Sequence, residues 1–109
     1  MVANVKDKAV IVGVGNTEFS KNSGVSELHL ACRAVKAASD DAGIHPSEID
    51  GMATFTMDTT DEIELARALG VGELTFWGRS HYGGGAATGS LHQAVMAVAT
   101  GMAETVVVY

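Results

Sequence analysis

A glycine-rich segment in the second half of the chain holds the residues best suited to chemistry. Glycines at a helix start let a ligand approach the free backbone amides. Those amides and the helix dipole favour an anion or a developing oxyanion. The sequence therefore predicts a site for an anionic or oxyanion-forming ligand at this point. The candidate substrate-binding residues are His81, Tyr82, Gly83, Gly84, Gly85 and Ser90.

Thr88 and Ser90 place two hydroxyl groups near the start of the helix expected here. Hydroxyls at a helix start commonly cap it or pack, and contact with a ligand is the other role open to them. A hydroxyl becomes a nucleophile only beside a general base, and none is visible at a useful spacing. We therefore do not expect Thr88 to be an activated nucleophile.

The predicted helix itself lacks charge. Between Arg79 and Glu104 the chain has no Asp, Glu, Lys or Arg. Because a helix with one face in water normally carries charge on that face, we expect a helix over about residues 85–100 that is buried on several sides. A packed core helix whose start binds nothing is the alternative. The segment is too polar for an ordinary transmembrane span.

Other motifs carry weaker signals. The pair Gly13 and Gly15 suggests a dinucleotide-binding turn, but Glu18 stands where a third glycine is required. Cys32 lies on an apolar helix stripe and is predicted to be a core residue without special reactivity. His92 is interpreted as a core histidine. The four histidines are dispersed, so no metal site is expected.

Composition excludes several classes of protein. The chain has 109 residues, of which 18% are charged, and its net charge is −6. No basic patch is visible, so nucleic-acid binding is not expected. A single cysteine rules out an internal disulfide framework, and the first residues lack a secretory signal pattern, so a cytoplasmic location is the default. The low share of charge indicates that something outside the chain covers much of its surface.

Hydrophobic patterning predicts the first elements. The β-branched run at residues 8–14 is typical of a buried parallel strand. Ser26 is a candidate N-cap for a helix that extends to about Ala42, and Gly43 is its natural terminator. One helical turn is expected to begin at Pro46.

The second half predicts three further strands, at residues 51–56, 73–78 and 105–109. Thr59 and Glu62 match a capping box that begins another helix. The order β-α-β-α-β-α-β favours an α/β fold with a parallel sheet and right-handed crossovers. The glycine-rich segment follows a strand, and so lies at the carboxyl edge of the sheet, where such folds bind ligands.

Taken in order, four segments resemble the N-terminal part of the thiolase superfamily. They are the opening strand and loop at 8–19, the passages Ala42-Gly43-Ile44 and Ile49-Asp50-Gly51, the helix at 83–98, and the strand at 103–108. The resemblance implies the start of the N-terminal half of a layered αβαβα fold. Residues 1–109 would then form part of one thiolase-like domain, inactive and poorly soluble by itself.

The resemblance departs from thiolases at the nucleophile. Thiolases read Cys-x-Ser-Gly-Leu-x-Ala there, whereas this chain reads Thr-Gly-Ser-Leu-His-Gln-Ala from Thr88 to Ala94. Thr88 thus takes the place of the cysteine, although acyl transfer by thiolysis needs a thiolate. Retro-aldol cleavage of a 3-hydroxyacyl-CoA needs only a base for the hydroxyl proton and donors for the thioester enolate.

The departure is similar to the cysteine-less, lipid-transfer-type relatives of thiolases, which include steroid side-chain aldolases. This implies an acyl-CoA substrate, no cofactor besides that coenzyme A, a homodimer with residues 73–78 near the subunit boundary, and a partner protein with a zinc ribbon and an OB-fold. Two alternatives stay open. One is a degradative thiolase, and the other is a non-catalytic subunit that binds acyl-CoA or serves as a scaffold.

Overall fold

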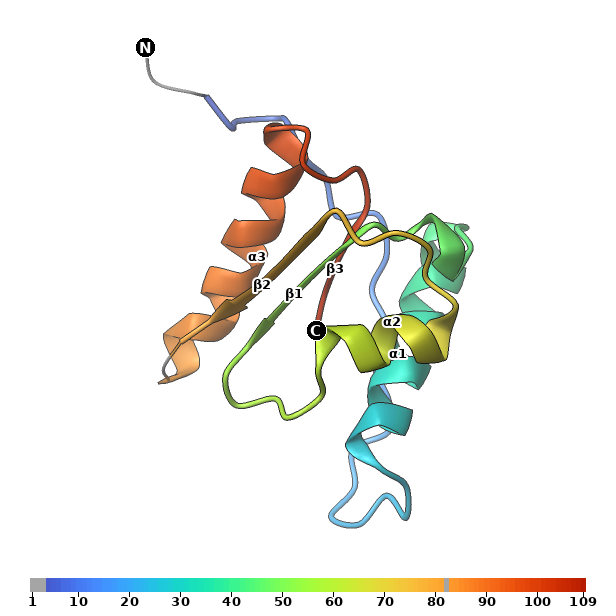
Figure 1. Ribbon diagram of the computed structural model, residues 1–109. Coiled ribbons are helices and arrows are strands. Elements are labelled where there is room, and N and C mark those ends of the chain that lie inside the picture. Colours follow the sequence, from blue (N-terminus) through green and yellow to red (C-terminus); the bar gives the residue numbers. More distant parts are fainter. Residues whose placement is uncertain (1–3, 82) are drawn as a thin grey trace.

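In the computed structural model, the described residues, 4–81 and 83–109, form three α-helices, a short 3-10 helix and a three-stranded parallel sheet (Figure 1). The strands are β1 (Gly51–Phe55), β2 (Phe76–Ser80) and β3 (Val106–Val108). Their order is β2-β1-β3, so β1 is the central strand. The architecture agrees with the predicted α/β class, with one strand fewer than expected.

The helices lie on both faces of the sheet (Figure 1). Their bounds are α1 Glu27–Ala42, η1 Pro46–Glu48, α2 Glu62–Leu69 and α3 Gly83–Ala99. Helices α1 and α2 cover one face, where Val35, Met52 and Leu65 form the centre of the hydrophobic core. Helix α3 covers the other face. The result is three layers with β1 in the middle.

The predicted ends of α1 are confirmed. The Ser26 hydroxyl accepts a hydrogen bond from the His29 amide at 3.1 Å. Gly43 ends the helix in a left-handed conformation with φ of 74°, which a glycine adopts without a steric penalty. The turn at Pro46 is also confirmed, and the His45 ring caps it by accepting the Ser47 amide at 3.1 Å.

The predicted capping box of α2 is wrong. The helix begins at Glu62 after Asp61, and the Asp61 side chain makes no capping hydrogen bond. The Thr59 hydroxyl donates instead to the carboxylate of Glu27 on α1, and Glu62 forms an ion pair with Arg79 at 3.3 Å. Both side chains of the expected box have partners on other elements, and sequence spacing cannot reveal those partners.

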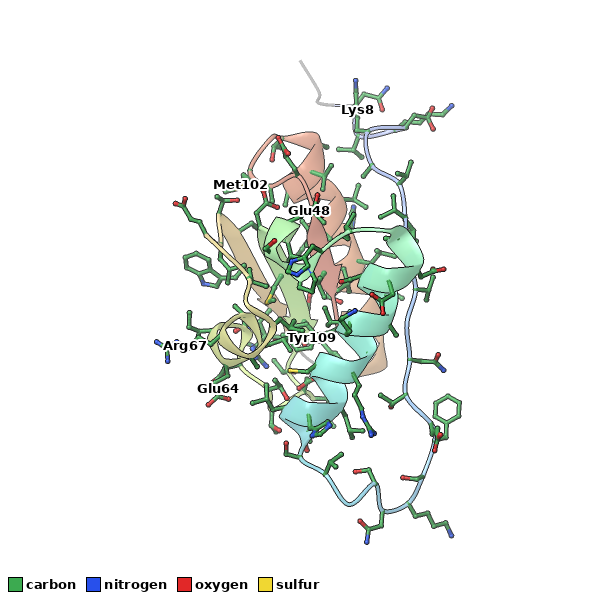
Figure 2. All side chains as sticks on the ribbon, turned by 90° about the vertical axis from the view of Figure 1, so that its right-hand side faces the viewer. Lys8, Glu48, Glu64, Arg67, Met102 and Tyr109 are labelled. Atoms are coloured by element: carbon green, nitrogen blue, oxygen red, sulfur yellow. The ribbon has the colours of Figure 1, made fainter. Side chains whose placement is uncertain are left out.

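The strand predicted at residues 8–14 is also absent. The segment runs beside α1 as an extended trace, apart from the sheet (Figure 2). Its amide at Val14 donates to the Asp41 carboxylate at 2.9 Å, and Val10 is 80% exposed. Because a strand exists only as a hydrogen-bonded pair, a β-branched run without a neighbouring strand remains irregular.

Two glycines bring this segment against α1. A Cβ added to Gly13 would lie 2.4 Å from the Ala38 carbonyl oxygen, and one added to Gly15 would lie 2.4 Å from that of Ala34. Both distances are far inside van der Waals contact. The Gly-x-Gly pattern is therefore explained by close packing of two backbones, with no need for a nucleotide.

Asp50 joins the amino ends of all three strands. Its carboxylate accepts the Glu104 amide at 3.0 Å and the Thr105 amide at 2.8 Å. Its carbonyl accepts the Thr75 amide at 2.8 Å. The strand expected at residues 73–78 begins only at Phe76, because this turn occupies the residues before it.

Helix α3 packs on the sheet through small residues. Its buried side chains are Ala86, Ser90, Ala94 and Ala97. On the sheet, Gly78 leaves room for Gln93, whose side-chain oxygen would lie 2.7 Å from an added Cβ. Small side chains on both surfaces bring the helix axis close to the strands, which fixes where the helix starts.

The expectation that α3 is buried on several sides is wrong for the described chain. Thr88, His92 and Met96 follow one another at a spacing of four residues and are all exposed, so one side of the helix faces solvent. The absence of charge correctly indicated an apolar helix. It could not show that Thr88, His92 and Met96 are exposed in the described chain. None of the described helices has the length and apolar character required to cross a bilayer.

We predict that Gly15→Ala lowers the free energy of unfolding by about 1–3 kcal/mol, because the new methyl group meets the Ala34 carbonyl. Gly72→Ala is the matched control, since its Cβ would lie 3.7 Å from the Ser47 carbonyl oxygen, an ordinary contact. Chemical denaturation of the natural full-length protein measures both. Equal effects of the two substitutions would contradict the packing role of Gly15.

Candidate functional site

The candidate site lies at the carboxyl edge of the parallel sheet. Here β1 leads into residues 56–61, which we call the β1–α2 loop, and β2 leads through His81 to α3 (Figure 1). The Thr56 amide donates to the Ser80 carbonyl at 2.9 Å, so the two connections are joined where they leave the sheet. Open α/β folds bind ligands at this edge.

The structure places the predicted glycine-rich segment at this edge. His81 is exposed and directly follows β2, and α3 begins at Gly83, so Gly83, Gly84 and Gly85 form its first turn. Tyr82 lies outside the described residues. The first-turn amides of a helix have no partners within the helix, which keeps anion or oxyanion binding as our prediction for this segment.

The structure does not bring Thr88 and Ser90 together. Because α3 starts at Gly83, both hydroxyls lie beyond the first turn expected for them. The Thr88 hydroxyl is on the exposed side and donates to the Gly85 carbonyl at 2.8 Å. Ser90 is 1% exposed on the sheet side, and its hydroxyl donates to the Ala87 carbonyl at 2.6 Å. Their ligand roles remain predictions.

A shallow hollow follows the exposed side of α3. It has a volume of about 460 Å³, and its lining residues are Gly85, Thr88, Gly89, Leu91, His92 and Val95. The interpretation of His92 as a core histidine is wrong, because its side chain is exposed one turn after Thr88. The spacing of four residues between Thr88 and His92 could have revealed this shared helix side.

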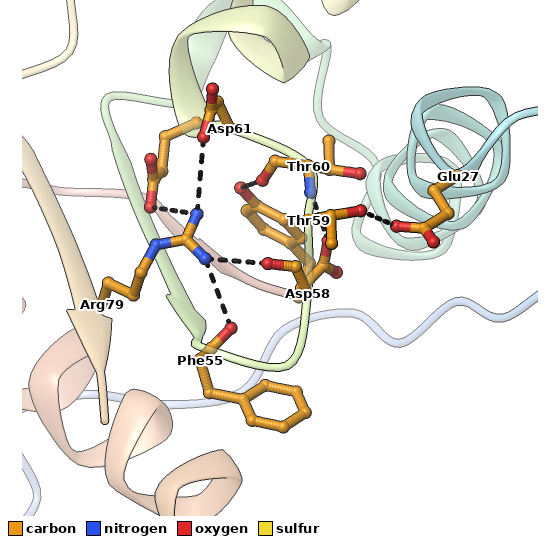
Figure 3. Close-up of polar contacts among 9 residues, drawn as sticks. Glu27, Phe55, Asp58, Thr59, Thr60, Asp61 and Arg79 are labelled. Atoms are coloured by element: carbon orange, nitrogen blue, oxygen red, sulfur yellow. Dashed lines mark hydrogen bonds and ion pairs between the residues drawn. The ribbon is translucent and has the colours of Figure 1, made fainter. Parts of the chain in front are cut away.

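A polar network supports the β1–α2 loop and was missed at the sequence level (Figure 3). The Arg79 Nη1 atom donates to the carbonyl oxygens of Asp58 at 2.8 Å and Phe55 at 3.5 Å. Its Nη2 atom lies 3.3 Å from a Glu62 carboxylate oxygen and 3.9 Å from one of Asp61. One guanidinium thus holds both ends of the loop.

Tyr109, the residue after β3, supports the same loop from the other side of β1. Its hydroxyl donates to the Thr60 carbonyl at 2.8 Å. Burial, together with the carboxylates of Glu62 and Asp58, raises the pKa of the Tyr109 phenol well above its usual range. The phenol therefore keeps its proton at neutral pH, and the hydrogen bond to the loop persists.

Other candidate groups offer little chemistry. Burial raises the pKa of the Cys32 thiol, which agrees with the predicted unreactive core cysteine. In the part of the chain that the structure describes, no three His, Cys, Asp or Glu side chains lie close enough to hold a metal ion.

We compared the chain with protein-family models, curated proteins and solved structures. No protein-family model matches the chain. The chain is similar to carbon–carbon-cleaving aldolases and lyases, and it spans about a quarter of the length of the curated relatives it matches.

Three relatives illustrate the similarity. A "Steroid side-chain-cleaving aldolase" of Thermomonospora curvata is 63% identical over 101 residues, which are 93% of this chain and 26% of that protein. The "17-hydroxy-3-oxo-4-pregnene-20-carboxyl-CoA lyase" of Mycobacterium tuberculosis is 60% identical over 102 residues, 94% of this chain and 26% of the lyase. A solved structure, "Ltp2-ChsH2(DUF35) aldolase", has a TM-score of 0.85 and 64% identity, covering 88% of this chain and 25% of that one.

We predict that Thr88 forms no covalent acyl intermediate. Its hydroxyl donates its proton to the Gly85 carbonyl and not to a base. Intact-mass analysis of the natural full-length protein, after incubation with an acyl-CoA, should show no adduct. An acyl group mapped to Thr88 would contradict this account and favour acyl transfer.

Proposed function

We propose that the natural full-length protein is an aldolase that cleaves a steroid side chain carried as a coenzyme A thioester. The observation that carries the proposal is 60% and 63% identity, over 93% or more of this chain, to a lyase and an aldolase whose names state this activity. The TM-score of 0.85 to a solved aldolase that is 64% identical agrees with it.

The name of the lyase defines the chemistry of the bond that breaks. The steroid thioester in that name carries a hydroxyl group on the ring carbon that is β to the thioester carbonyl. A general base removes the hydroxyl proton, and that oxygen forms a ketone as the bond to the side chain breaks. The bonding electron pair forms a thioester enolate, which takes one proton to give propanoyl-CoA. The step is neutral in redox terms and requires no cofactor other than the coenzyme A of the substrate.

The start of α3 supplies groups that suit the enolate. Backbone amides of the first turn, at Gly83 to Gly85, are preorganised donors for a developing oxyanion, and His81 stands two residues before Gly83. We place the thioester oxygen at this turn. Thr88 supports an aldolase over a thiolase, because it replaces the nucleophilic cysteine with a hydroxyl whose proton is donated to the Gly85 carbonyl.

Assembly follows from the same class. The solved relative's name joins two proteins and a DUF35 element, which supports a partner protein for this one. We propose that this partner has the zinc ribbon and OB-fold implied by the thiolase-like resemblance. We also propose a homodimer formed near the edge strand β2, whose Trp77 side chain is 64% exposed.

The test uses the natural full-length protein, with and without a DUF35 partner, and 17-hydroxy-3-oxo-4-pregnene-20-carboxyl-CoA as substrate. Mass spectrometry should detect equal amounts of propanoyl-CoA and a ring ketone, and free coenzyme A should make no difference. A requirement for free coenzyme A, with a shortened steroid thioester as product, would favour the thiolase alternative. Binding without turnover under both conditions would favour a non-catalytic subunit.

A further inference from the structure

The β1–α2 loop borders the candidate site. It leaves β1 at the carboxyl edge of the sheet, and Thr56 is hydrogen-bonded to Ser80, one residue before His81. The loop thus lies beside the connection that leads to the first turn of α3. A ligand bound at that turn would therefore lie close to the β1–α2 loop. Contacts with other parts of the chain determine the conformation of this loop.

Surface loops normally leave their carbonyl groups to water. In the β1–α2 loop, one side chain from β2 and one from the residue after β3 take this role. Arg79 of β2 binds the carbonyls of Phe55 and Asp58, and Tyr109, which follows β3, binds that of Thr60. Inside the loop, the Thr60 amide donates to the Asp58 carboxylate at 2.7 Å. These contacts hold the loop at the carbonyls of Asp58 and Thr60, and Arg79 also binds Phe55, the last residue of β1.

Strand register brings the two anchors together. Thr54 pairs with Arg79, and Tyr109 follows Val108, which pairs with Ala53. Residues opposite one another in parallel strands project from the same face. Arg79, Thr54 and Tyr109 therefore form one row across the sheet beneath the loop. Thr54 is fully buried, so the middle of this row is not exposed to solvent.

The contacts of Arg79 distinguish a positioning role from direct ligand binding. Its side chain is 28% exposed, and its two terminal nitrogens already contact two carbonyls and two carboxylates (Figure 3). Those contacts neutralise its charge locally. The guanidinium thus fixes the loop and has little capacity left for a substrate anion.

We propose that the β1–α2 loop forms one wall of the acyl-CoA site and that Arg79 is the residue that positions this wall. The inference rests on the proposed function and adds a specificity element to it. A planar guanidinium spans several acceptors at once, whereas a lysine ammonium is a point charge. The loop position therefore depends on arginine and not merely on a positive charge.

The experiment compares three variants of the natural full-length protein, assayed with its DUF35 partner. Arg79→Lys keeps the charge but loses the bridging geometry. Tyr109→Phe removes the second anchor and keeps the aromatic ring. Arg67→Lys is the matched control, because Arg67 is exposed on the outer side of α2 (Figure 2). KM and kcat for the steroid thioester and the thermal midpoint are measured for each variant.

We expect Arg79→Lys to raise KM about tenfold while kcat changes less than about threefold, the pattern of lost substrate binding. Tyr109→Phe should raise KM about threefold, and Arg67→Lys should leave both constants within about twofold. A fall in the thermal midpoint of Arg79→Lys with unchanged KM would show a purely structural role and overturn the inference.

A second measurement separates this inference from the proposed function. Hydrogen exchange of residues 56–61 is recorded in the wild-type protein with and without the steroid thioester. Protection of the loop by the thioester supports the wall even if no cleavage occurs, in which case only the proposed reaction fails. Binding without protection of the loop overturns the wall even where cleavage is observed. Absence of both binding and cleavage overturns both proposals.

Discussion

The close contact between α3 and the sheet is the constraint on which the rest of this structure depends. It exists because small residues face one another on the two surfaces. Gly78 leaves room for the Gln93 side chain, and Gly89 would bring a Cβ to 3.3 Å from the Ser80 hydroxyl. Larger side chains would move the helix outward. Because only two residues separate β2 from α3, such a shift would also displace the glycine turn that we assign to the thioester.

The two ends of the sheet are held by different charged residues. At the amino end, the Asp50 carboxylate binds the amides that lead into β3. At the carboxyl end, the Arg79 guanidinium binds the β1–α2 loop. Both charged groups are only partly exposed, and both are hydrogen-bonded to backbone partners. Together they fix strand register at one edge and loop shape at the other.

Local signals predicted the parts of the fold that depend on local chemistry. Ser26 and Gly43 define α1 because capping acts within a few residues. The strand at residues 8–14 and the Thr59 capping box could not be predicted correctly, because both depend on which distant element lies alongside. The same holds for the site. The glycines predicted the start of α3. The Arg79 network could not be predicted, because it depends on the register of β1 and β2 and on the position of Tyr109.

The central claim is that the carbon–carbon bond breaks to a thioester enolate, and a solvent isotope measures this directly. The natural full-length protein and its DUF35 partner are incubated with 17-hydroxy-3-oxo-4-pregnene-20-carboxyl-CoA in deuterated water. The propanoyl-CoA product is then analysed by mass spectrometry. Our account predicts one deuterium on the carbon next to the thioester carbonyl, since the enolate takes one proton from its surroundings. Propanoyl-CoA without solvent deuterium, or a steroid product that carries coenzyme A, would contradict it.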